Sequence, residues 1–305
     1  MNITKVLAFL SIYLIWGSTY LLNKIAVGQL EPFMLAGVRF LSASFLMFLI
    51  VKLSRKSLKV TLVQLKNAAI AGFLFLAIGN GVVVWALSYV DSGLAALTIA
   101  SQPLIVLLLL WILENKRIKL FSWVGVFVGL LGMYLLISQN QITSSPESLK
   151  GILMIIGCVI TWGYASIFVG KAELPKNYLV NSAYQMFFGS LWLILMSMIK
   201  QEYWISPNEW EINVKWSMLG LIIFGSIVAF TSFNYLLRTV SPEKVATSTY
   251  INPIVAMILG YLVLKETIST QSVVAAVVLL TGVYFINMRR DPRVYLRARA
   301  MKRLK

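Results

Sequence analysis

The sequence has no histidine, a single cysteine and few charged residues. Only 12% of its 305 residues are charged, whereas 59% are hydrophobic, and the mean hydropathy is +0.82. Soluble domains carry about 25% charged residues, so a water-soluble globular protein is excluded. Without histidine the chain lacks the commonest metal ligand and the usual proton switch near neutral pH, and Cys158 alone cannot form an intramolecular disulfide. We therefore expect neither a metal site nor a cofactor.

Acidic residues are scarce as well, with 11 Asp and Glu against 27 Lys and Arg and a formal charge of +16. In a soluble protein this excess would indicate nucleic acid as a partner, but in so apolar a chain membrane topology explains it better. We expect no nucleic-acid partner. The apolar stretches contain no paired aspartates, no His-Glu-x-x-His motif, no Ser/His pair and no Gly-rich phosphate loop. We therefore do not expect an enzyme.

Long uncharged stretches dominate the chain. Nine of them have 18 or more residues, and a tenth, 32–51, is interrupted only by Arg39. A helix needs about 20 apolar residues to cross the hydrocarbon core of a membrane. The nine uninterrupted stretches are 6–23, 67–90, 92–113, 120–146, 151–170, 177–199, 216–237, 245–264 and 267–288. These lengths predict an all-α membrane protein with ten transmembrane helices.

Lysine and arginine are distributed unequally between the two sides of such a bundle. When alternate connections are assigned to alternate sides, 21 basic residues fall on the side of the two termini and five on the other. Because cytoplasmic loops carry the excess of Lys and Arg, we expect both termini in the cytoplasm and the chain in the plasma membrane, the inner membrane of a bacterium. The basic tail 289–305 fits either a topology signal alone or binding of anionic lipid headgroups.

The chain resembles itself at a shift of about half its length. Trp16-Gly17 matches Trp162-Gly163 at a shift of 146 residues. Further matches occur at a shift of 150, namely Pro103 with Pro253, Ile118 with Ile268, Gly132 with Gly282, and Tyr134 with Tyr284. Each copy holds five predicted helices, and an odd number means that the second copy crosses the membrane in the opposite sense. Inverted repeats of this kind enclose a site near the midplane that is exposed to each side in turn, although a repeat can also be purely structural.

Several short motifs, in their order and doubling, resemble those of a known family. They are Ile15-Trp16-Gly17-Ser18-Thr19-Tyr20, Ala36-Gly37-Val38-Arg39-Phe40, Gly79-Asn80-Gly81, the prolines Pro103 and Pro253, and Leu264-Lys265-Glu266-Thr267-Ile268. The chain resembles the EamA branch of the drug/metabolite transporter superfamily, and within it the YedA-type members. This resemblance implies a first EamA repeat at 1–140 with helices 1–5, a second at 150–288 with helices 6–10, and usually export of amino acids or other small metabolites. One departure is that Lys116 stands where the second repeat has Glu266, which concerns loop capping more than transport.

Polar and aromatic residues recur at helical spacing inside three of the predicted spans. They are Trp16, Thr19, Tyr20 and Asn23 in the first span, Asn181, Tyr184, Gln185 and Phe188 in the seventh, and Thr231, Asn234, Tyr235 and Arg238 in the eighth. Residues at i, i+3, i+4 and i+7 share one face of a helix. Polar groups inside a span are costly unless they face protein or water. Each stripe therefore either lines a pathway or forms hydrogen bonds between helices.

An amide side chain precedes a proline in both copies, as Gln102-Pro103 and Asn252-Pro253. Proline has no N–H and disrupts the bond to the carbonyl four residues earlier, so each pair predicts a kink. A freed carbonyl beside an amide makes a polar binding wall. The alternative is a packing kink whose carbonyl is satisfied by Thr98 or Ser248.

Other positions complete the candidate site. Asn80 lies between two glycines, which let a partner helix or a ligand approach the backbone. Trp16 and Trp162 either form apolar walls of a site or belong to the aromatic belt at the membrane surface. Gly125, Gly129 and Gly132 form a small-residue face that helix packing explains most simply. The full set of substrate-binding candidates is Trp16, Tyr20, Asn80, Gln102, Trp162, Asn234, Tyr235, Tyr250 and Asn252.

Arg39 is the only charge inside a predicted span, and none of the 11 acids falls within one. It can snorkel to the outer interface, pair with backbone carbonyls or bind a substrate carboxylate. We expect a secondary transporter of small amphipathic metabolites, amino acids first among them. The alternatives are a carrier of anionic or phosphorylated metabolites that uses Arg39 and Lys24, and a non-transporting scaffold or lipid-handling protein. No oligomeric state is predicted.

The absence of an embedded acid predicts the energetics of transport. Proton-driven carriers commonly use a membrane-embedded Asp or Glu. We therefore expect facilitated diffusion, exchange, or coupling without a dedicated carboxylate. Collapsing the proton gradient across proteoliposomes, with the substrate gradient held constant, should leave transport unchanged. Transport that stops under this treatment would contradict the prediction.

Overall fold

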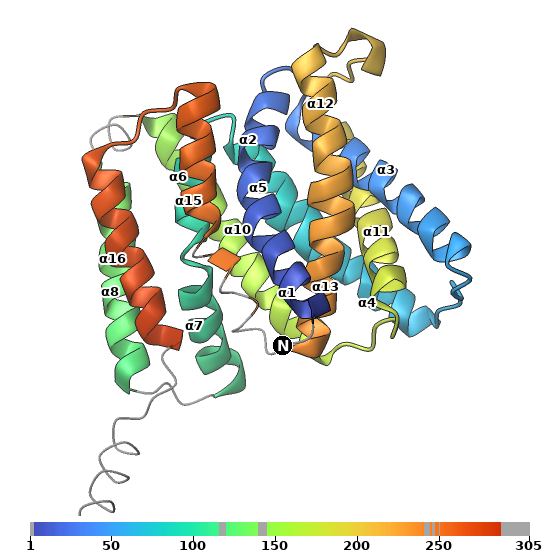
Figure 1. Ribbon diagram of the computed structural model, residues 1–305, viewed down its shortest axis with the longest axis horizontal. Coiled ribbons are helices and arrows are strands. Elements are labelled where there is room, and N and C mark those ends of the chain that lie inside the picture. Colours follow the sequence, from blue (N-terminus) through green and yellow to red (C-terminus); the bar gives the residue numbers. More distant parts are fainter. Residues whose placement is uncertain are drawn as a thin grey trace, which may run out of the picture.

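The computed structural model describes residues 3–115, 120–139, 145–240, 245, 248–249 and 251–287, and the regular segments within them are all helical (Figure 1). The first half contains α1 (Ile3–Leu10), η1 (Ser11–Ile15), α2 (Trp16–Ala26), α3 (Pro32–Leu53), α4 (Leu62–Gly72), η2 (Phe73–Gly81), α5 (Val82–Ala86), α6 (Ser92–Ile99), α7 (Gln102–Glu114) and α8 (Leu120–Ile137). The second half contains α10 (Pro146–Lys171), α11 (Tyr178–Ile199), η3 (Pro207–Glu209), α12 (Ile212–Gly220), η4 (Leu221–Phe230), α13 (Thr231–Thr239), α15 (Asn252–Leu259), η6 (Gly260–Leu264) and α16 (Thr270–Asn287). Except for η3, the η segments are π-helical turns within longer helices.

Seven helical spans of the described chain are long and apolar enough to cross a membrane. They are Ile3–Ala26, Pro32–Leu53, Leu62–Ala86, Ser92–Glu114, Pro146–Lys171, Tyr178–Ile199 and Ile212–Thr239. Three further apolar helices are shorter, at Ser122–Ile137, Asn252–Leu264 and Thr270–Phe285. The prediction of an all-α membrane protein is confirmed. Within the expected span 245–264, α15 begins at Asn252, one residue before Pro253, because proline favours the first turn of a helix.

The helices stand side by side with connections at two opposite faces (Figure 1). We call the face at which α1 begins the N-terminal face; it also carries the segments 54–61 and 172–177. The segments 27–31, 87–91, 200–211 and 265–269 lie at the other face, which we call the opposite face. The basic tail 289–305 lies outside the described residues.

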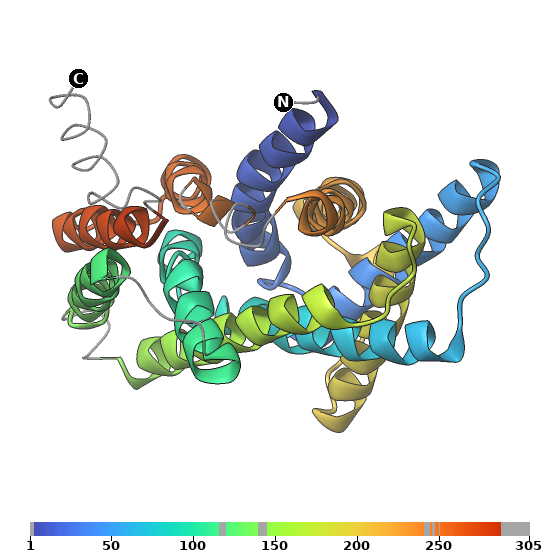
Figure 2. The same cartoon turned by 90° about the horizontal axis from the view of Figure 1, so that it is seen from below.

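The pair α8 and α16 packs through glycine at one edge of the molecule, as both views show (Figures 1 and 2). A Cβ at Gly132 would lie 2.6 Å from the backbone nitrogen of Leu279, and one at Gly282 would collide with the backbone of Gly129. Small residues at a membrane helix interface let two backbones approach closely. The packing interpretation of the glycine face is therefore confirmed at these positions.

Several backbone features recur at the spacings of the sequence repeat. Among the described residues, Arg55, Asn115, Gln201 and Lys265 are the non-glycine positions with positive φ. Arg55 and Gln201 are 146 residues apart, and Asn115 and Lys265 are 150 apart. The π-helical segments η2 and η4 also lie in corresponding spans. The two halves therefore end equivalent helices in the same way, with a residue in the left-handed backbone conformation.

The close approach of α8 and α16 predicts the effect of adding one methyl group. Gly282→Ala should destabilise the protein by about 1–3 kcal/mol, because the new Cβ meets backbone that cannot yield as a side chain can. The measurement is the thermal unfolding midpoint in detergent. Gly157→Ala on α10 is the matched control, since nothing lies within 4 Å of a Cβ there, and its midpoint should stay equal or rise. Equal midpoints for Gly282→Ala and the parent protein would contradict this packing.

Candidate functional site

A cavity lies among the helices of both halves. Seven of the sequence-predicted positions line it, namely Trp16, Tyr20, Arg39, Asn80, Gln102, Trp162 and Asn252. These side chains come from six elements that are distant in sequence, namely α2, α3, η2, α7, α10 and α15. The segment η4 adds Gly225 and Phe230 to the lining. The first predicted stripe lies entirely on this wall, because Thr19 and Asn23 line the cavity too.

Aromatic rings form one wall of the cavity. The rings of Trp16 and Trp162 meet edge to face with centroids 5.8 Å apart and an interplanar angle of 87°. Phe233 lies 5.0 Å from Trp16 and 5.6 Å from Trp162, and Phe75 lies 4.8 Å from Trp162. Such edge-to-face pairs add to the burial of apolar area. The structure therefore places both tryptophans at the cavity and not in an aromatic belt.

Both amide–proline pairs begin helices beside the cavity. The span Ser92–Glu114 breaks at Ala100 and Ser101, so that Gln102 is the first residue of α7, as Asn252 is of α15. Thr98 and Ser248 do not donate to the carbonyls freed by the prolines. Thr98 donates to the carbonyl of Leu94 at 2.9 Å, and Ser248 donates to the carbonyl of Val245 at 3.2 Å. Each break thus turns a helix N-terminus toward the cavity, and a helix N-terminus carries partial positive charge.

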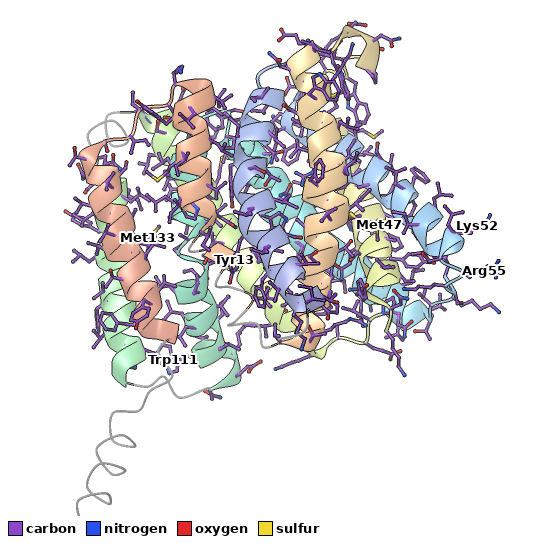
Figure 3. The ribbon with its side chains drawn as sticks, viewed as in Figure 1. Tyr13, Met47, Lys52, Arg55, Trp111 and Met133 are labelled. Atoms are coloured by element: carbon purple, nitrogen blue, oxygen red, sulfur yellow. The ribbon has the colours of Figure 1, made fainter. Side chains whose placement is uncertain are left out.

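The two amides differ in their partners. With its amide oriented as a donor, Asn252 Nδ2 lies 2.8 Å from the carbonyl of Tyr13 and 3.1 Å from those of Ile12 and Ser248. Figure 3 labels Tyr13 near the middle of the molecule. Gln102 Nε2 is buried without a hydrogen-bond partner, and so is Asn80 Oδ1. Buried polar groups are almost always satisfied, so two unsatisfied amides at one cavity indicate a place for a polar ligand or water.

Glycines bring large side chains close to these positions. A Cβ at Gly79 would lie 2.9 Å from the Trp162 ring, and one at Gly163 would lie 3.4 Å from Gln102 Nε2. A Cβ at Gly225 would lie 3.0 Å from Arg39 Nη2. The expected close approach beside Asn80 is thus made by the Trp162 ring.

Arg39 is buried in α3, with 2% of its surface exposed. Its Nε donates to Ser226 Oγ at 2.8 Å, and its Nη1 lies 3.4 Å from Asn23 Oδ1. The guanidinium carbon lies 4.6 Å from the centroid of the Phe40 ring. Within the described residues no carboxylate forms a salt bridge with it. A buried cation with only neutral partners is energetically costly, so this position marks a functional site.

Sequence reasoning missed Ser226 and Phe233. Ser226 is 146 residues beyond Asn80, and Gly225 is 146 beyond Gly79. The repeat spacing was therefore a signal that would have identified the Gly225-Ser226 pair. Phe233 had no such signal, because one phenylalanine among 16 in an apolar span is not distinctive.

The amides of the stripes in the seventh and eighth predicted spans bond to one another, and neither stripe contributes to the cavity lining. Asn234 Oδ1 accepts from Asn181 Nδ2 at 3.1 Å, and Asn234 Nδ2 donates to Ser182 Oγ at 3.1 Å. Gln185 Nε2 donates to Asn181 Oδ1 at 3.1 Å. The prediction that Asn234 lines the cavity is thus corrected: its side chain points from α13 toward α11, where buried amides satisfy one another.

Two other predicted positions also lie elsewhere, and the position of a third is not described. The Tyr235 ring packs on Tyr178 with centroids 5.3 Å apart, away from the cavity lining. Tyr250 lies outside the described residues. Lys24 Nζ donates to the carbonyls of Leu87 and Val90, each at 2.7 Å, so its charge is not directed into the cavity.

The different partners of Asn234 and Gln102 predict opposite effects on stability. Asn234→Ala should lower the free energy of unfolding by about 1–3 kcal/mol, because it leaves buried amides without a partner. Gln102→Leu removes an amide nitrogen that has no hydrogen-bond partner. The thermal unfolding midpoint of this variant should therefore stay the same or rise. Loss of stability in Gln102→Leu equal to that in Asn234→Ala would show that Gln102 is satisfied and structural.

Comparison with known proteins agrees with this architecture. The model of the "EamA-like transporter family" matches the chain twice, at residues 3–138 and 149–288. The inner membrane transporter YedA of Escherichia coli strain K12, described as uncharacterized, is 35% identical over 92% of this chain and 90% of its own length. The uncharacterized transporter YoaV of Bacillus subtilis is 23% identical over 91% of this chain and 94% of its own.

A solved crystal structure shares the fold. It aligns with a TM-score of 0.67 at 17% identity and covers 94% of this chain and 97% of its own chain. At this identity the likeness supports the fold alone. The family matches and the apolar helices together identify a multi-pass protein of the plasma membrane that is a transporter and not an enzyme. The chain belongs to the EamA-like transporter family.

Proposed function

We propose that this protein is a secondary transporter of small amphipathic metabolites that carry a carboxylate, amino acids first among them. The transport pathway runs through the central cavity by alternating access. The observation that carries the proposal is the cavity wall itself, where one buried arginine lies among aromatic side chains and, in the described part of the chain, forms no salt bridge with a carboxylate.

The cavity offers separate surfaces for the two ends of such a solute. Arg39 and the N-termini of α7 and α15 provide positive charge for a carboxylate. Asn80 Oδ1 is an unsatisfied acceptor for an ammonium or hydroxyl group, and Gln102 Nε2 is an unsatisfied donor. The rings of Trp16, Trp162 and Phe233 cover an aliphatic or aromatic side chain. A solute with all three features satisfies groups that are otherwise costly to bury.

Alternating access is supported by features that occur in pairs. Gly17 packs on α15 beside Val255 and the carbonyl of Asn252, whereas Gly163 packs on α7 beside Leu109 and Val106. The two Trp-Gly pairs, 146 residues apart, thus contact the turns that follow the two proline breaks. We infer ten transmembrane helices in two inverted repeats of five, so that equivalent hairpins open the cavity to each face in turn.

A carrier of anionic metabolites is the second candidate, because Arg39 lines the cavity. Lys24 does not join it, since its ammonium is bonded to the carbonyls of Leu87 and Val90. One cation suits a single carboxylate better than a doubly charged phosphate. A scaffold or lipid-handling role has less support, because it gives no reason for unsatisfied amides at a central cavity.

Sidedness and direction complete the proposal. The excess of lysine and arginine at the N-terminal face supports cytoplasmic termini. Efflux rests on the family resemblance alone. Efflux is tested by measuring the cellular content of a transported solute, which overexpression of the protein should lower.

Replacement of Arg39 tests the proposed function. Arg39→Gln should reduce uptake of a carboxylate solute into proteoliposomes by about 10- to 100-fold, the effect of losing a charged hydrogen bond. Uptake of the corresponding decarboxylated amine should change much less. The measurement is labelled uptake from a panel of amino acids and their amines, on protein checked for unchanged size-exclusion behaviour.

Lys52→Gln is the matched control, because Lys52 is an exposed basic residue on the same helix that does not line the cavity. Figure 3 labels it at the edge of the molecule. It should leave uptake unchanged. Equal loss of both solutes in Arg39→Gln, together with loss of folded protein, would assign Arg39 a purely structural role. Absence of flux across the whole panel for the parent protein would count against transport of these metabolites.

A further inference from the structure

The turn 87–91 joins α5 to α6 at the opposite face and is held from one side by a lysine. Lys24, in the last turn of α2, donates to the carbonyls of Leu87 and Val90 at 2.7 Å each. Leu87 is the residue that follows α5, so the ammonium lies at the C-terminus of this helix. A cation at a helix C-terminus satisfies free carbonyls and complements the helix dipole.

A carboxylate holds the residues that directly follow this turn. Glu266, which follows η6, accepts hydrogen bonds from Ser92 N at 2.8 Å, Ser92 Oγ at 2.8 Å and Gly93 N at 3.2 Å. These groups form the first turn of α6. The N-cap residue Asp91 makes no side-chain cap bond there, so Glu266 supplies the anion that a helix N-terminus favours.

The carboxylate fits because a glycine leaves room for it. A Cβ at Gly260 would collide with Glu266 Oε2 and lie 2.8 Å from Ser92 Oγ. Burial, and then the nearby Glu266 carboxylate, raise the pKa of Asp91, whereas Lys24 lowers it. The charged groups of this turn therefore act on one another.

This arrangement has no counterpart at the positions related by the repeat. A shift of 146 residues takes Lys24 to Gly170, and a shift of 150 takes Glu266 to Lys116. The backbone that presents Glu266 is nevertheless repeated, because Lys265 and Asn115 share positive φ values of 57° and 51°. The same helix ending thus carries an acid in one half and a base in the other. A lysine side chain has no hydrogen-bond acceptor, so it cannot accept bonds from the N–H groups of a helix N-terminus.

The held turn joins elements that line the cavity. Tyr20 and Asn23 on α2 precede Lys24 by one turn or less, and Val83 precedes Leu87 by four residues. The end of α2, the start of α6 and the helix formed by α15 and η6 meet at this face (Figure 1). Lys24 and Glu266 therefore tie together helices that must separate if the cavity is to open here.

We propose that Lys24 and Glu266 form a latch that keeps the cavity closed at the opposite face. Release of the 87–91 turn from Lys24, and of the first turn of α6 from Glu266, is the step that opens the cavity there. The inference rests on the alternating access proposed above. Neither side chain contacts the transported solute, so both are positioning residues that set the balance between the two open states.

Accessibility of Cys158 tests the latch independently of flux. This residue is the only cysteine of the sequence and lines the cavity. A membrane-impermeant methanethiosulfonate reagent is added to one side of sealed vesicles at a time. Cys158→Ser gives the background, and Tyr203→Cys in that background identifies the opposite face, because Tyr203 is 73% exposed in the segment 200–211.

Loss of the latch should make labelling face-specific. Glu266→Gln, and separately Lys24→Gln, should raise the labelling rate of Cys158 from the opposite face by about 10-fold, as expected for loss of a charged hydrogen bond. Labelling from the N-terminal face should fall. The matched control is Glu173→Gln, because Glu173 Oε1 accepts from Gln64 Nε2 at 3.3 Å at the N-terminal face. This control should not raise labelling from the opposite face.

A second reporter, Thr19→Cys in the Cys158→Ser background, is measured in the same way, because Thr19 also lines the cavity. Unchanged labelling at both reporters overturns the latch, and so does an equal rise from both faces, which indicates a loosened fold. Flux of the amino-acid panel is recorded on the same protein. A face-specific shift without flux supports the latch and counts against the proposed substrates, whereas flux without the shift does the reverse.

Discussion

A membrane interior offers no water to backbone groups, and this constraint governs where the chain can leave helical geometry. The break at Ala100 and Ser101 and the start of α15 at Asn252 both leave such groups at mid-span. Both adjoin the central cavity, where protein and solvent can satisfy them. Gly17 and Gly163 allow neighbouring helices to pack against the turns that follow. The breaks, the glycines and the cavity are therefore parts of one arrangement.

The same constraint determines the placement of charge. Arg39 is buried at the cavity among neutral partners. Two carboxylates at the opposite face serve helix ends instead. Glu202, whose side chain is 1% exposed, accepts from Phe33 N at 3.2 Å and Met34 N at 2.8 Å, and Glu266 does the same for α6. Glu202 and Glu266 thus satisfy helix N-termini at one face, whereas Arg39 lies at the cavity.

Much of the candidate site followed from the repeat. Trp16 and Trp162, and Gln102 and Asn252, were selected because they occur twice, and the structure places all four at one cavity. Spacing alone was a weaker guide. The stripes that contain Tyr20 and Asn234 have the same i, i+3, i+4 pattern, yet only the first faces the cavity. Helical periodicity shows which residues share a face, but it does not show toward which neighbour that face is turned.

The sequence by itself determined that this is an all-α membrane protein, because span length and hydropathy are local properties of the chain. It also determined where the helices break and which polar residues lie inside them. Only the tertiary structure decided that Asn234 bonds to α11, and that the amide of Asn252 has hydrogen-bond partners whereas Gln102 Nε2 has none. It also decided that Lys24 and Glu266 hold the connection between α5 and α6. These outcomes depend on the rotation and contact of helices far apart in sequence, and that information is carried by packing and not by spacing.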